Sequence, residues 1–336
     1  MINEPLVSIL IPVYNREKLI GETLESAINQ TYKNIEIIIV DNNSTDKTWE
    51  ILKSYSQKDK RIKIYRNEEN IGPVRNWRRC FEYAQGEYAK FLWSDDLIAP
   101  EFIEKTLPYL INNPDVGFVF TGTEIFFSEE NNKKFKAFFI GETGLYPTEK
   151  FIESMLLGEP YPVSVSPGNA LFRMKDLYKN TLLDIPNKKG IDFSKYAMGN
   201  DALIYLFTAK DYAMFASINE VLSFFRAHMG SITISSNRKF LGSCYLLAKV
   251  YFVKNYLKDG ELVKKFNAIL LLDTLKYGNK NDLKSIIKDI DLKIDIIYAL
   301  KRIVKKLYRN LGSILKRIVK KLYRNLGSIL KLSNLF

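Results

Sequence analysis

Two adjacent carboxylates, Asp95 and Asp96, follow a short apolar run in the first third of the chain. Two like charges side by side are costly unless a positive group joins them. Carboxylate oxygens are the ligands that Mg²⁺ and Mn²⁺ prefer, and such a cation commonly bridges phosphates. The pair therefore predicts a cation site for a phosphate-bearing substrate. The alternative is a solvated turn in which the aspartate before Leu97 is the N-cap of a helix.

Two more polar clusters stand in the same kind of position. Each of the three follows an apolar run: Tyr14-Asn15, Asp41-Asn42-Asn43 and Ser94-Asp95-Asp96. In an open α/β sheet, ligands bind beyond the carboxyl ends of the strands. We therefore expect the three clusters to meet at one edge of a sheet.

The elements that position these clusters can be predicted from the spacing of apolar residues. Strands are expected over residues 7–13, 35–41, 61–65, 88–93, 116–121, 212–217 and 221–226. Helices are expected over residues 19–30, 45–55, 74–84, 100–110 and 201–208, and from about residue 239 onward. Buried strands that alternate with helices indicate an α/β fold with a mostly parallel sheet covered on both faces.

Four segments, taken in order, resemble family 2 glycosyltransferases of the GT-A fold. They are IPVYNR at 11–16, NQTYKNIEIIIVDNNSTD at 29–46, NIGPVRN at 70–76 and GEYAKFLWSDD at 86–96. The order and spacing match across roughly residues 5–230. The resemblance implies a nucleotide-sugar donor, with a UDP-sugar favoured, and Mn²⁺ or Mg²⁺ as cofactor. It also implies inversion at the anomeric carbon, and we expect a glycan or lipid-linked acceptor in bacterial-type surface polysaccharide or glycoconjugate assembly.

The resemblance assigns roles to individual positions. Residues expected at the nucleotide sugar are Pro12, Tyr14, Asp41, Asn42, Arg75, Asn76 and Asp95, and Asp96 is expected to bind the metal. Two of the family's usual acids are replaced, by Asn42 and by Trp93. An amide still donates and accepts at a pyrimidine edge, and an indole suggests stacking on a base or sugar. Arg75 suits a phosphate because a guanidinium pairs with it bidentately; a surface charge at a helix start is the alternative.

The candidate catalytic base lies in the second half of the chain. An acidic pair opens a helix at this point of the family pattern, and here Asn200 replaces the first acid while Asp201 keeps the second. Inverting transfer needs such a group within reach of the acceptor hydroxyl. The alternative role for Asp201 is a helix cap, since a helix N-terminus favours negative charge.

His228 is the sole histidine of the chain. It lies in a segment that resembles the one in which the family closes a histidine over the metal and diphosphate, and neutral imidazole is a competent ligand. A purely structural histidine is the alternative. Gly168 and Asn169 resemble the loop beneath the acceptor sugar, although a turn explains the glycine equally well.

The charge of the chain is concentrated at its C-terminal end. Residues 300–336 contain eleven Lys and Arg and no acid, so the remaining 299 residues carry about +1 of the formal net charge of +12. The same stretch repeats fifteen residues, LKRIVKKLYRNLGSI, at 300–314 and 315–329. We therefore divide the chain into a GT-A domain (1–235), a helical extension (236–299) and a basic amphipathic tail (300–336).

The tail predicts attachment to an anionic membrane surface through residues 300–331. Self-association through its apolar seam, giving a homo-oligomer, and packing on the rest of the chain are the alternatives. Nucleic acid is not an expected partner, because residues 1–299 lack a stripe of basic and aromatic side chains. Few cysteines, no signal-like N-terminus and no long apolar run favour a cytoplasmic protein, peripheral on the inner face of the membrane.

Two other classes of function stay open at the level of sequence. A nucleotidyltransferase also combines an α/β sheet with acids and metal, but residues 8–20 lack its glycine-rich phosphate loop. A non-catalytic, membrane-associated carbohydrate-binding scaffold would fit the replacement of acids at Asn42, Trp93 and Asn200. Metal-dependent transfer from nucleotide sugars separates these alternatives.

Overall fold

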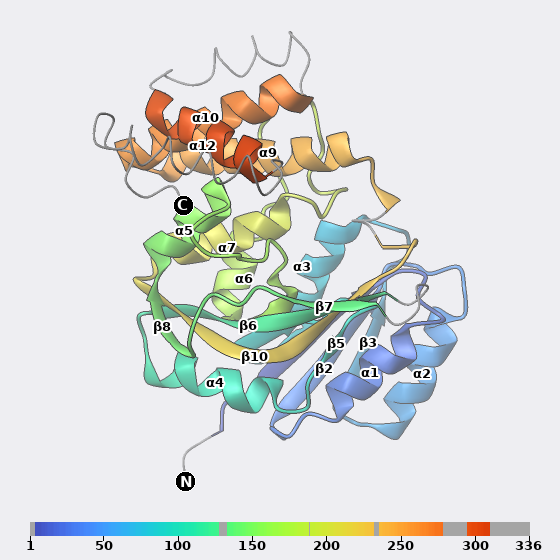
Figure 1. Ribbon diagram of the computed structural model, residues 1–336. Coiled ribbons are helices and arrows are strands. Elements are labelled where there is room, and N and C mark those ends of the chain that lie inside the picture. The colour runs from blue at the N-terminus through green and yellow to red at the C-terminus, as the bar shows by residue number, and fades with distance from the viewer. Residues whose placement is uncertain (1–3, 128–132, 188, 232–234, 278–293, 310–336) are drawn as a thin grey trace. The chain divides into compact units, whose positions relative to one another are not determined.

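The structure is a computed structural model that describes residues 4–127, 133–187, 189–231, 235–277 and 294–309 (Figure 1). It divides into two compact units, Met1–Asn255 and Tyr256–Phe336. The division falls twenty residues after the position 235 chosen from sequence, so helix α9 (Arg238–Tyr256) belongs almost wholly to the first unit.

A single mixed sheet organises the first unit. Its described strands are β1 (Val7–Val13), β2 (Ile35–Asp41), β3 (Ile62–Arg66), β4 (Tyr88–Phe91), β5 (Leu97–Ile98), β6 (Val116–Phe127), β7 (Lys134–Ala137), β8 (Gly144–Pro147), β9 (Ala170–Arg173) and β10 (Met214–Ala227). The strand order is β3-β2-β1-β4-β9-β6-β10-β5, with β7 paired to β6 and β8 to β10.

The long pairings of this sheet are parallel. Strands β3, β2, β1 and β4 run in one direction, and β6 runs parallel to β10. The antiparallel partners β5, β7, β8 and β9 have four residues or fewer. The predicted α/β fold with a mostly parallel sheet is confirmed. The two strands expected at 212–217 and 221–226 form one strand, β10, which continues through register shifts next to β6.

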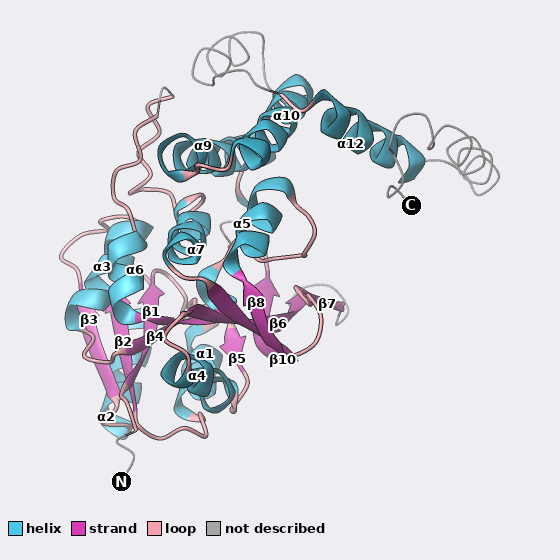
Figure 2. Ribbon diagram, turned by 90° about the vertical axis from the view of Figure 1, so that its left-hand side faces the viewer, coloured by secondary structure: helices cyan, strands magenta, loops and turns pink. Residues whose placement is uncertain are grey.

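Helices cover both faces of the sheet. Their bounds are α1 (Ile20–Ile28), α2 (Thr48–Lys58), α3 (Pro73–Tyr83), α4 (Phe102–Asn112), α5 (Thr148–Leu157), α6 (Met174–Asn180) and α7 (Asn200–Asp211). Helices α1, α2 and α4 lie on one side, and α3, α5, α6 and α7 on the other (Figure 2). This two-sided cover explains why β1 and β2 read as continuous apolar runs.

Alternate residues of each strand enter different halves of the core. The odd-numbered residues of β1, such as Ile9 and Ile11, pack with Leu24 of α1 and Leu107 of α4 in one buried apolar cluster. The other side is rich in aromatic residues and includes Phe118 of β6, whose ring lies 4.8 Å from that of Phe151 and 5.0 Å from that of Tyr205. The core thus holds the strand ends of β1, β2 and β4 in fixed register.

The second unit contains helices α10 (Gly260–Tyr277) and α12 (Ile296–Arg309), which pack against each other. Helix α12 covers the first ten residues of the predicted basic tail. The rest of the tandem repeat, residues 310–329, lies outside the described residues. In the part of the chain that is described, no helix combines the length and apolar character needed to cross a bilayer.

Candidate active site

A cavity of about 1030 Å³ opens beyond the carboxyl ends of β1, β2 and β4. The predicted site residues that line it are Pro12, Tyr14, Asn42, Asn76, Asp95, Asp96 and Asp201. The three polar clusters therefore meet at one edge of the sheet, together with the start of α7. The other predicted residues, which lie behind the lining or beside it, are Asp41, Arg75, Gly168, Asn169 and His228.

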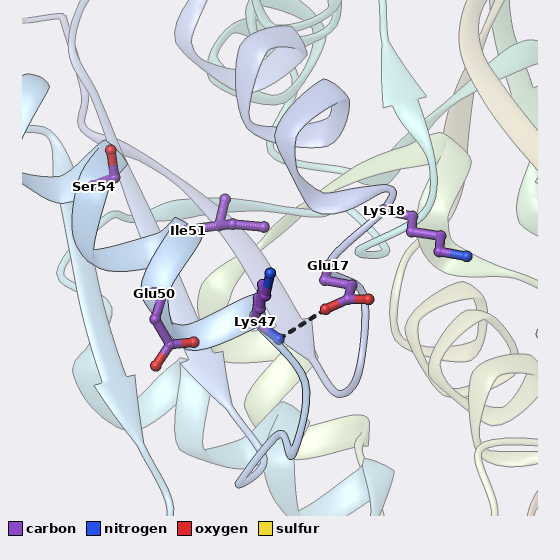
Figure 3. A pocket seen from close by; sticks show the side chains of 6 residues that line it. All are labelled: Glu17, Lys18, Lys47, Glu50, Ile51 and Ser54. Carbon is purple, nitrogen blue, oxygen red and sulfur yellow. Dashed lines mark hydrogen bonds between the residues drawn. The ribbon is translucent and has the colours of Figure 1, made fainter.

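A second hollow, of about 420 Å³, lies between the loop after β1 and the start of α2 (Figure 3). Charged side chains dominate its lining, and the Oε2 of Glu17 accepts a hydrogen bond from the backbone N–H of Lys47 at 3.0 Å. It is open, and none of the residues predicted for the site lines it. We therefore place the chemistry in the larger cavity.

Asp95 is held by two side chains from other strand ends. Its Oδ2 lies 2.9 Å from Nε2 of His228, which follows β10, and 3.4 Å from a guanidinium nitrogen of Arg16, which follows β1. The backbone N–H of Gly230 donates to Nδ1 of the His228 ring at 3.1 Å. A nitrogen that accepts carries no proton, so the ring is neutral and its Nε2–H donates to Asp95. A metal bond from His228 would require one of these two hydrogen bonds to break.

Asp96 is buried, with 7% of its surface exposed, and lines the cavity. Its Oδ1 accepts the backbone N–H of Arg226 at 2.8 Å, and its Oδ2 makes no hydrogen bond with the residues described. Burial, and then the charge of Asp95, raise the pKa of Asp96 well above its usual range. A carboxylate in this position gains most from a cation that neutralises it.

The surroundings of Asp96 fit a cation that is shared with a substrate. Within the described ranges, no three or more His, Cys, Asp or Glu side chains are grouped so as to hold a metal by themselves. Mg²⁺ is commonly bound by one or two carboxylates, with phosphate and water supplying the other ligands. One protein carboxylate with an uncommitted oxygen suits that mode of binding.

Lys90, on β4, is completely buried and interacts electrostatically with Asp96. Its ammonium donates to the carbonyl oxygen of Gly168 and stands 4.5 Å from the ring centre of Phe102. Burial lowers the pKa of Lys90 to about 7, and the charge of Asp96 opposes this effect. Lys90 and Asp96 therefore each favour the charged form of the other.

The predicted acceptor loop lies under the cavity floor. The Oδ1 of Asn169 accepts the hydroxyl of Tyr205 at 2.8 Å, and its amide donates to the carbonyl of Thr121 at 3.0 Å. A Cβ at Gly168 would stand 2.6 Å from Nε1 of the Trp93 indole. Glycine is therefore required here by close packing.

Trp93 forms part of the cavity wall. Its Nε1 donates to Ser166 at 2.8 Å, and its ring packs 5.0 Å from Trp77, which also lines the cavity. At position 93, where family 2 glycosyltransferases often have an acid, this chain has an aromatic side chain. The ring also stacks on that of Phe91, with the ring centres 4.9 Å apart, so the indole is held in one position at the cavity wall.

Asp41 is fully buried behind the cavity wall. Both of its oxygens accept the backbone N–H of Ser44, the Ser44 hydroxyl donates to Oδ1, and Arg66 pairs with Oδ2 at 3.2 Å. Burial raises the pKa of Asp41, whereas these partners lower it. The side chain fixes the turn after β2 that carries Asn42 to the cavity.

Asn42 belongs to a network of amides. Its Oδ1 accepts from the amide of Asn67 at 2.9 Å and from the backbone N–H of Ile71 at 3.0 Å, and its Nδ2 donates to Oδ1 of Asn70 at 2.8 Å. The backbone N–H of Gly72 also donates to that Asn70 oxygen. Because backbone N–H groups can only donate, both amide orientations are fixed. Only N–H donors of Asn42 and Asn70 remain for a ligand.

Asn76 and Arg75 support the same corner. Asn76 accepts from Asn67 at 2.8 Å and donates to the carbonyl of Val40 at 3.0 Å. Arg75 donates to the hydroxyl of Ser194, which precedes cavity residue Lys195. In this structure Arg75 therefore orders the segment that closes one side of the cavity.

Asp201 stands at the start of α7 with 9% of its surface exposed. Burial raises the pKa of Asp201 to about 7, against hydrogen bonds from Tyr245 and backbone N–H groups that lower it. A base works best when its pKa lies near the working pH. The neighbouring Asn200 is committed elsewhere, since its amide exchanges hydrogen bonds with the backbone of Leu182.

A model of the family described as Glycosyl transferase family 2 matches residues 8–180, just over half of the chain. This match includes β1 to β4 and all three polar clusters. The chain belongs to glycosyl transferase family 2. It is therefore a glycosyltransferase by family, and the resemblance found in its motifs is confirmed.

Relatives of this family 2 glycosyltransferase are themselves named as glycosyltransferases. It is 29% identical over 245 residues to the Escherichia coli UDP-Glc:alpha-D-GlcNAc-diphosphoundecaprenol beta-1,3-glucosyltransferase WfaP, covering 73% of this chain and 86% of that protein. It is 40% identical over 119 residues to TuaG of Bacillus subtilis, whose name provisionally places it in teichuronic acid biosynthesis, covering 35% and 47%. An uncharacterized Haemophilus influenzae glycosyltransferase is 44% identical over 111 residues, which cover 33% of this chain and 44% of that one. For this relative and two further curated ones, the matched stretch spans less than half the length of the relative.

The fold has solved counterparts. The crystal structure of S. aureus TarS residues 1–349 in complex with UDP-GlcNAc matches with a TM-score of 0.61 and 17% identity, covering 98% of this chain and 88% of that one. The GT-A fold expected from the motifs is thus confirmed for this family 2 glycosyltransferase.

Several site residues of the glycosyltransferase were not singled out from sequence. Arg16 lies inside a quoted motif, and Arg226 stands two residues before His228, so both could have been found by position. Lys90 was also inside a motif, but its burial is visible only in three dimensions. Tyr245 lies on α9, outside every motif, and no sequence signal points to it.

Proposed function

We propose that this family 2 enzyme transfers a sugar, with inversion, from a nucleotide-diphosphate sugar to a hydroxyl of a glycan or lipid-linked acceptor. The observation that carries the proposal is that a buried carboxylate suited to a cation, Asp96, and a carboxylate with a pKa near 7, Asp201, line the same cavity. Asp96 would hold a cation at the leaving diphosphate, and Asp201 would take the proton of the attacking hydroxyl. Surface polysaccharide or glycoconjugate assembly is the proposed setting.

With these two carboxylates, every bond and proton of the transfer is accounted for. The acceptor oxygen attacks the anomeric carbon and forms the new C–O bond, while the bond from that carbon to the diphosphate oxygen breaks. Asp201 takes the proton of the acceptor hydroxyl, and the nucleoside diphosphate leaves with the bonding electrons. A single in-line displacement inverts the configuration, and holding both substrates in one cavity supplies much of the rate.

The donor end is proposed to lie over β1, β2 and the loop after β4. Tyr14, with 40% of its surface exposed, offers its ring to a base, and Asn42 and Asn70 offer N–H donors to carbonyl or ring-nitrogen acceptors of that base. A Mn²⁺ or Mg²⁺ ion held by Asp96 would neutralise the charge that develops on the leaving diphosphate. WfaP, named for UDP-Glc, and TarS, solved with UDP-GlcNAc, favour a UDP-sugar.

The acceptor end is proposed to surround Asp201. The cavity lining includes the aromatic side chains Tyr196, Phe240 and Tyr245, and the hydroxyl of Tyr245 donates to Asp201 at 2.6 Å. Flat aromatic faces suit the apolar face of a pyranose ring. Ser166, which precedes Gly168 and Asn169, also lines the cavity, so this loop would meet the acceptor through Ser166.

A donor-binding experiment tests the proposal. We expect UDP, UDP-glucose or UDP-GlcNAc with Mn²⁺ to raise the melting temperature, because a ligand that binds the folded state stabilises it. GDP- and dTDP-sugars serve as comparison ligands. UDP release that requires the intact Asp201 would complete the case. Absence of both a thermal shift and nucleotide release with all of these donors would overturn it.

We also propose that α12 attaches the enzyme to the anionic inner face of the cell membrane, which places it on a cytoplasmic surface. Its exposed apolar residues include Ile296, Leu300 and Ile303, which are 68%, 56% and 39% exposed and are spaced four and three apart; Ile297, beside Ile296, is 59% exposed. Ile296, Leu300 and Ile303 therefore form one helix face. The neighbouring Lys301 and Lys305 supply charge opposite to that of anionic lipids. An apolar stripe with basic flanks is the pattern of a helix that lies in a membrane interface.

Vesicle flotation tests this attachment. We expect the protein to float with phosphatidylglycerol-rich vesicles, less at high salt, and not with neutral phosphatidylcholine vesicles. The Leu300→Ser, Ile303→Ser double variant should stay in the bottom fraction, whereas Ser26→Ala, on α1, should float like the wild type. Flotation that the double variant retains would refute the proposal. The proposal would also be refuted if the protein dimerised through the Leu300 and Ile303 face of α12 and did not bind vesicles.

A further inference from the structure

Both carboxylate oxygens of the candidate base, Asp201, accept hydrogen bonds. The Oδ1 of Asp201 accepts the backbone N–H groups of Gly199 and Ala202, each at 2.8 Å. Its Oδ2 accepts the hydroxyl of Tyr245 at 2.6 Å. The two backbone donors come from the turn into α7 itself. Tyr245 is different, because it reaches the carboxylate from the separate helix α9.

Helix α9 is packed against that turn at close range. Gly199 has a φ of +97°, and a Cβ there would stand 2.9 Å from the carbonyl oxygen of Cys244 and 3.1 Å from Ala248. The residue before Tyr245 therefore touches the backbone before α7. A second contact follows about two helical turns further along, where the ring centres of Phe207 and Phe252 lie 5.5 Å apart. The position of the Tyr245 hydroxyl is thus set by backbone packing.

We propose that Tyr245 is the positioning residue of the catalytic base: its hydroxyl fixes the Asp201 carboxylate at the cavity wall and stabilises its charged form. The proposal rests on the role of Asp201 put forward above. Tyr245 also lines the cavity, so the carboxylate and its donor face the same space. A charge-assisted O–H···O⁻ bond of this length belongs to the stronger class of hydrogen bonds.

Among the described residues, Cys244 on α9 is another titratable group that interacts electrostatically with Asp201. Burial, and then the charge of Asp201, raise the pKa of its thiol to about 11, so the thiol is neutral in the working range. Burial and Asp201 raise the pKa of Tyr245 well above its usual range, so its hydroxyl keeps its proton and donates. Among the described neighbours, Tyr245 is therefore the side chain that favours the ionised carboxylate.

Removal of the hydroxyl should change the pH dependence of the reaction. Without Tyr245 as donor, Asp201 holds its proton more tightly, so its pKa rises. In Tyr245→Phe we expect the acid limb of kcat/KM for UDP release from UDP-glucose or UDP-GlcNAc to move up by about one to two pH units. At pH 7 the rate should fall about 5- to 50-fold, and it should approach the wild-type rate at the alkaline end of the profile. Tyr251→Phe, which removes a hydroxyl from the same helix, should keep the wild-type profile.

A stability cycle tests the contact without any substrate. The loss of unfolding free energy caused by Tyr245→Phe should be larger at pH 9, where Asp201 is ionised, than at pH 6. In an Asp201→Asn background that pH dependence should vanish. Should the phenylalanine variant fail to fold, 3-fluorotyrosine placed at 245 keeps the shape and makes the donor more acidic, so the acid limb should move to lower pH.

The outcomes separate the two proposals. An Asp201→Asn variant with full activity would remove the base assignment, whatever Tyr245 does. If Asp201→Asn is inactive but Tyr245→Phe keeps the wild-type pH profile and a pH-independent stability loss, the base stands and the role of Tyr245 is refuted. A shifted limb together with a pH-dependent, Asp201-dependent stability loss supports both.

Discussion

Replacement of Asn42 by aspartate tests whether the amide network is oriented as described. The two side chains have nearly the same shape, and the carboxylate can still accept from Asn67 and from the backbone of Ile71. Its second oxygen, however, would face Oδ1 of Asn70, which cannot turn away because it accepts the backbone N–H of Gly72. The change exchanges one hydrogen bond for a contact between two acceptors.

The cost can be worked from that exchange. Asn42 is 3% exposed, so the lost bond and the unsatisfied acceptor pair should lower the unfolding free energy by about 1–3 kcal/mol at pH 8. Burial and the facing acceptor should raise the pKa of the new carboxyl above its unfolded value. A carboxyl group whose pKa is higher in the folded than in the unfolded state stabilises the folded protein as the pH falls. Here the protonated aspartic acid at position 42 can donate a hydrogen bond to Asn70. The loss should therefore be smaller at pH 5.

Urea unfolding followed by circular dichroism at pH 5 and pH 8 measures this difference between variant and wild type. Asn34→Asp makes the same chemical change at an exposed amide that donates to the backbone of Glu4, and it should stay within about 0.5 kcal/mol at both pH values. An Asn42→Asp protein as stable as wild type at pH 8, or one equally destabilised at both pH values, would refute the assigned orientation.

Two further predictions concern the floor of the cavity. Gly168→Ala should lower the unfolding free energy by about 1–3 kcal/mol and weaken substrate binding, because the new Cβ would displace Trp93; urea unfolding and the KM for UDP-sugar measure both effects, and an unchanged protein would contradict the close packing. Tyr205→Phe should cost about 1–3 kcal/mol by leaving Oδ1 of the buried Asn169 without its donor, and a stability equal to wild type would show that this bond contributes nothing.

Sequence patterns were sufficient for the scaffold of the site. Strands β1 and β2 were predicted with their observed bounds, because unbroken β-branched runs have few alternatives to a buried parallel strand. The rule that ligands bind at the carboxyl ends of strands then brought Tyr14, Asn42 and Asp96 to one cavity. This inference needs local pattern and topology alone, both of which a single sequence carries.

The division of labour among the polar residues needed the structure. Asp41 and Asn42 are neighbours in sequence, yet one faces the interior and pairs with Arg66 while the other faces the cavity. His228 contacts Asp95 because β10 pairs with β5, the short strand that directly follows Asp95 and Asp96, although the two segments lie more than a hundred residues apart in sequence. Side-chain partners of this kind depend on tertiary packing, so the periodicity and spacing of residues in the sequence do not predict them.

The most direct test of the account is the pH profile of sugar transfer by wild type and Asp201→Asn. The base must be ionised to accept a proton, so wild-type kcat/KM should rise with pH through about 7 as Asp201 loses its proton. Asp201→Asn should bind UDP-sugar with wild-type affinity, lose about 10²- to 10⁴-fold in kcat/KM, and lack that acid limb. Wild-type activity in Asp201→Asn, or an unchanged acid limb, would contradict the account.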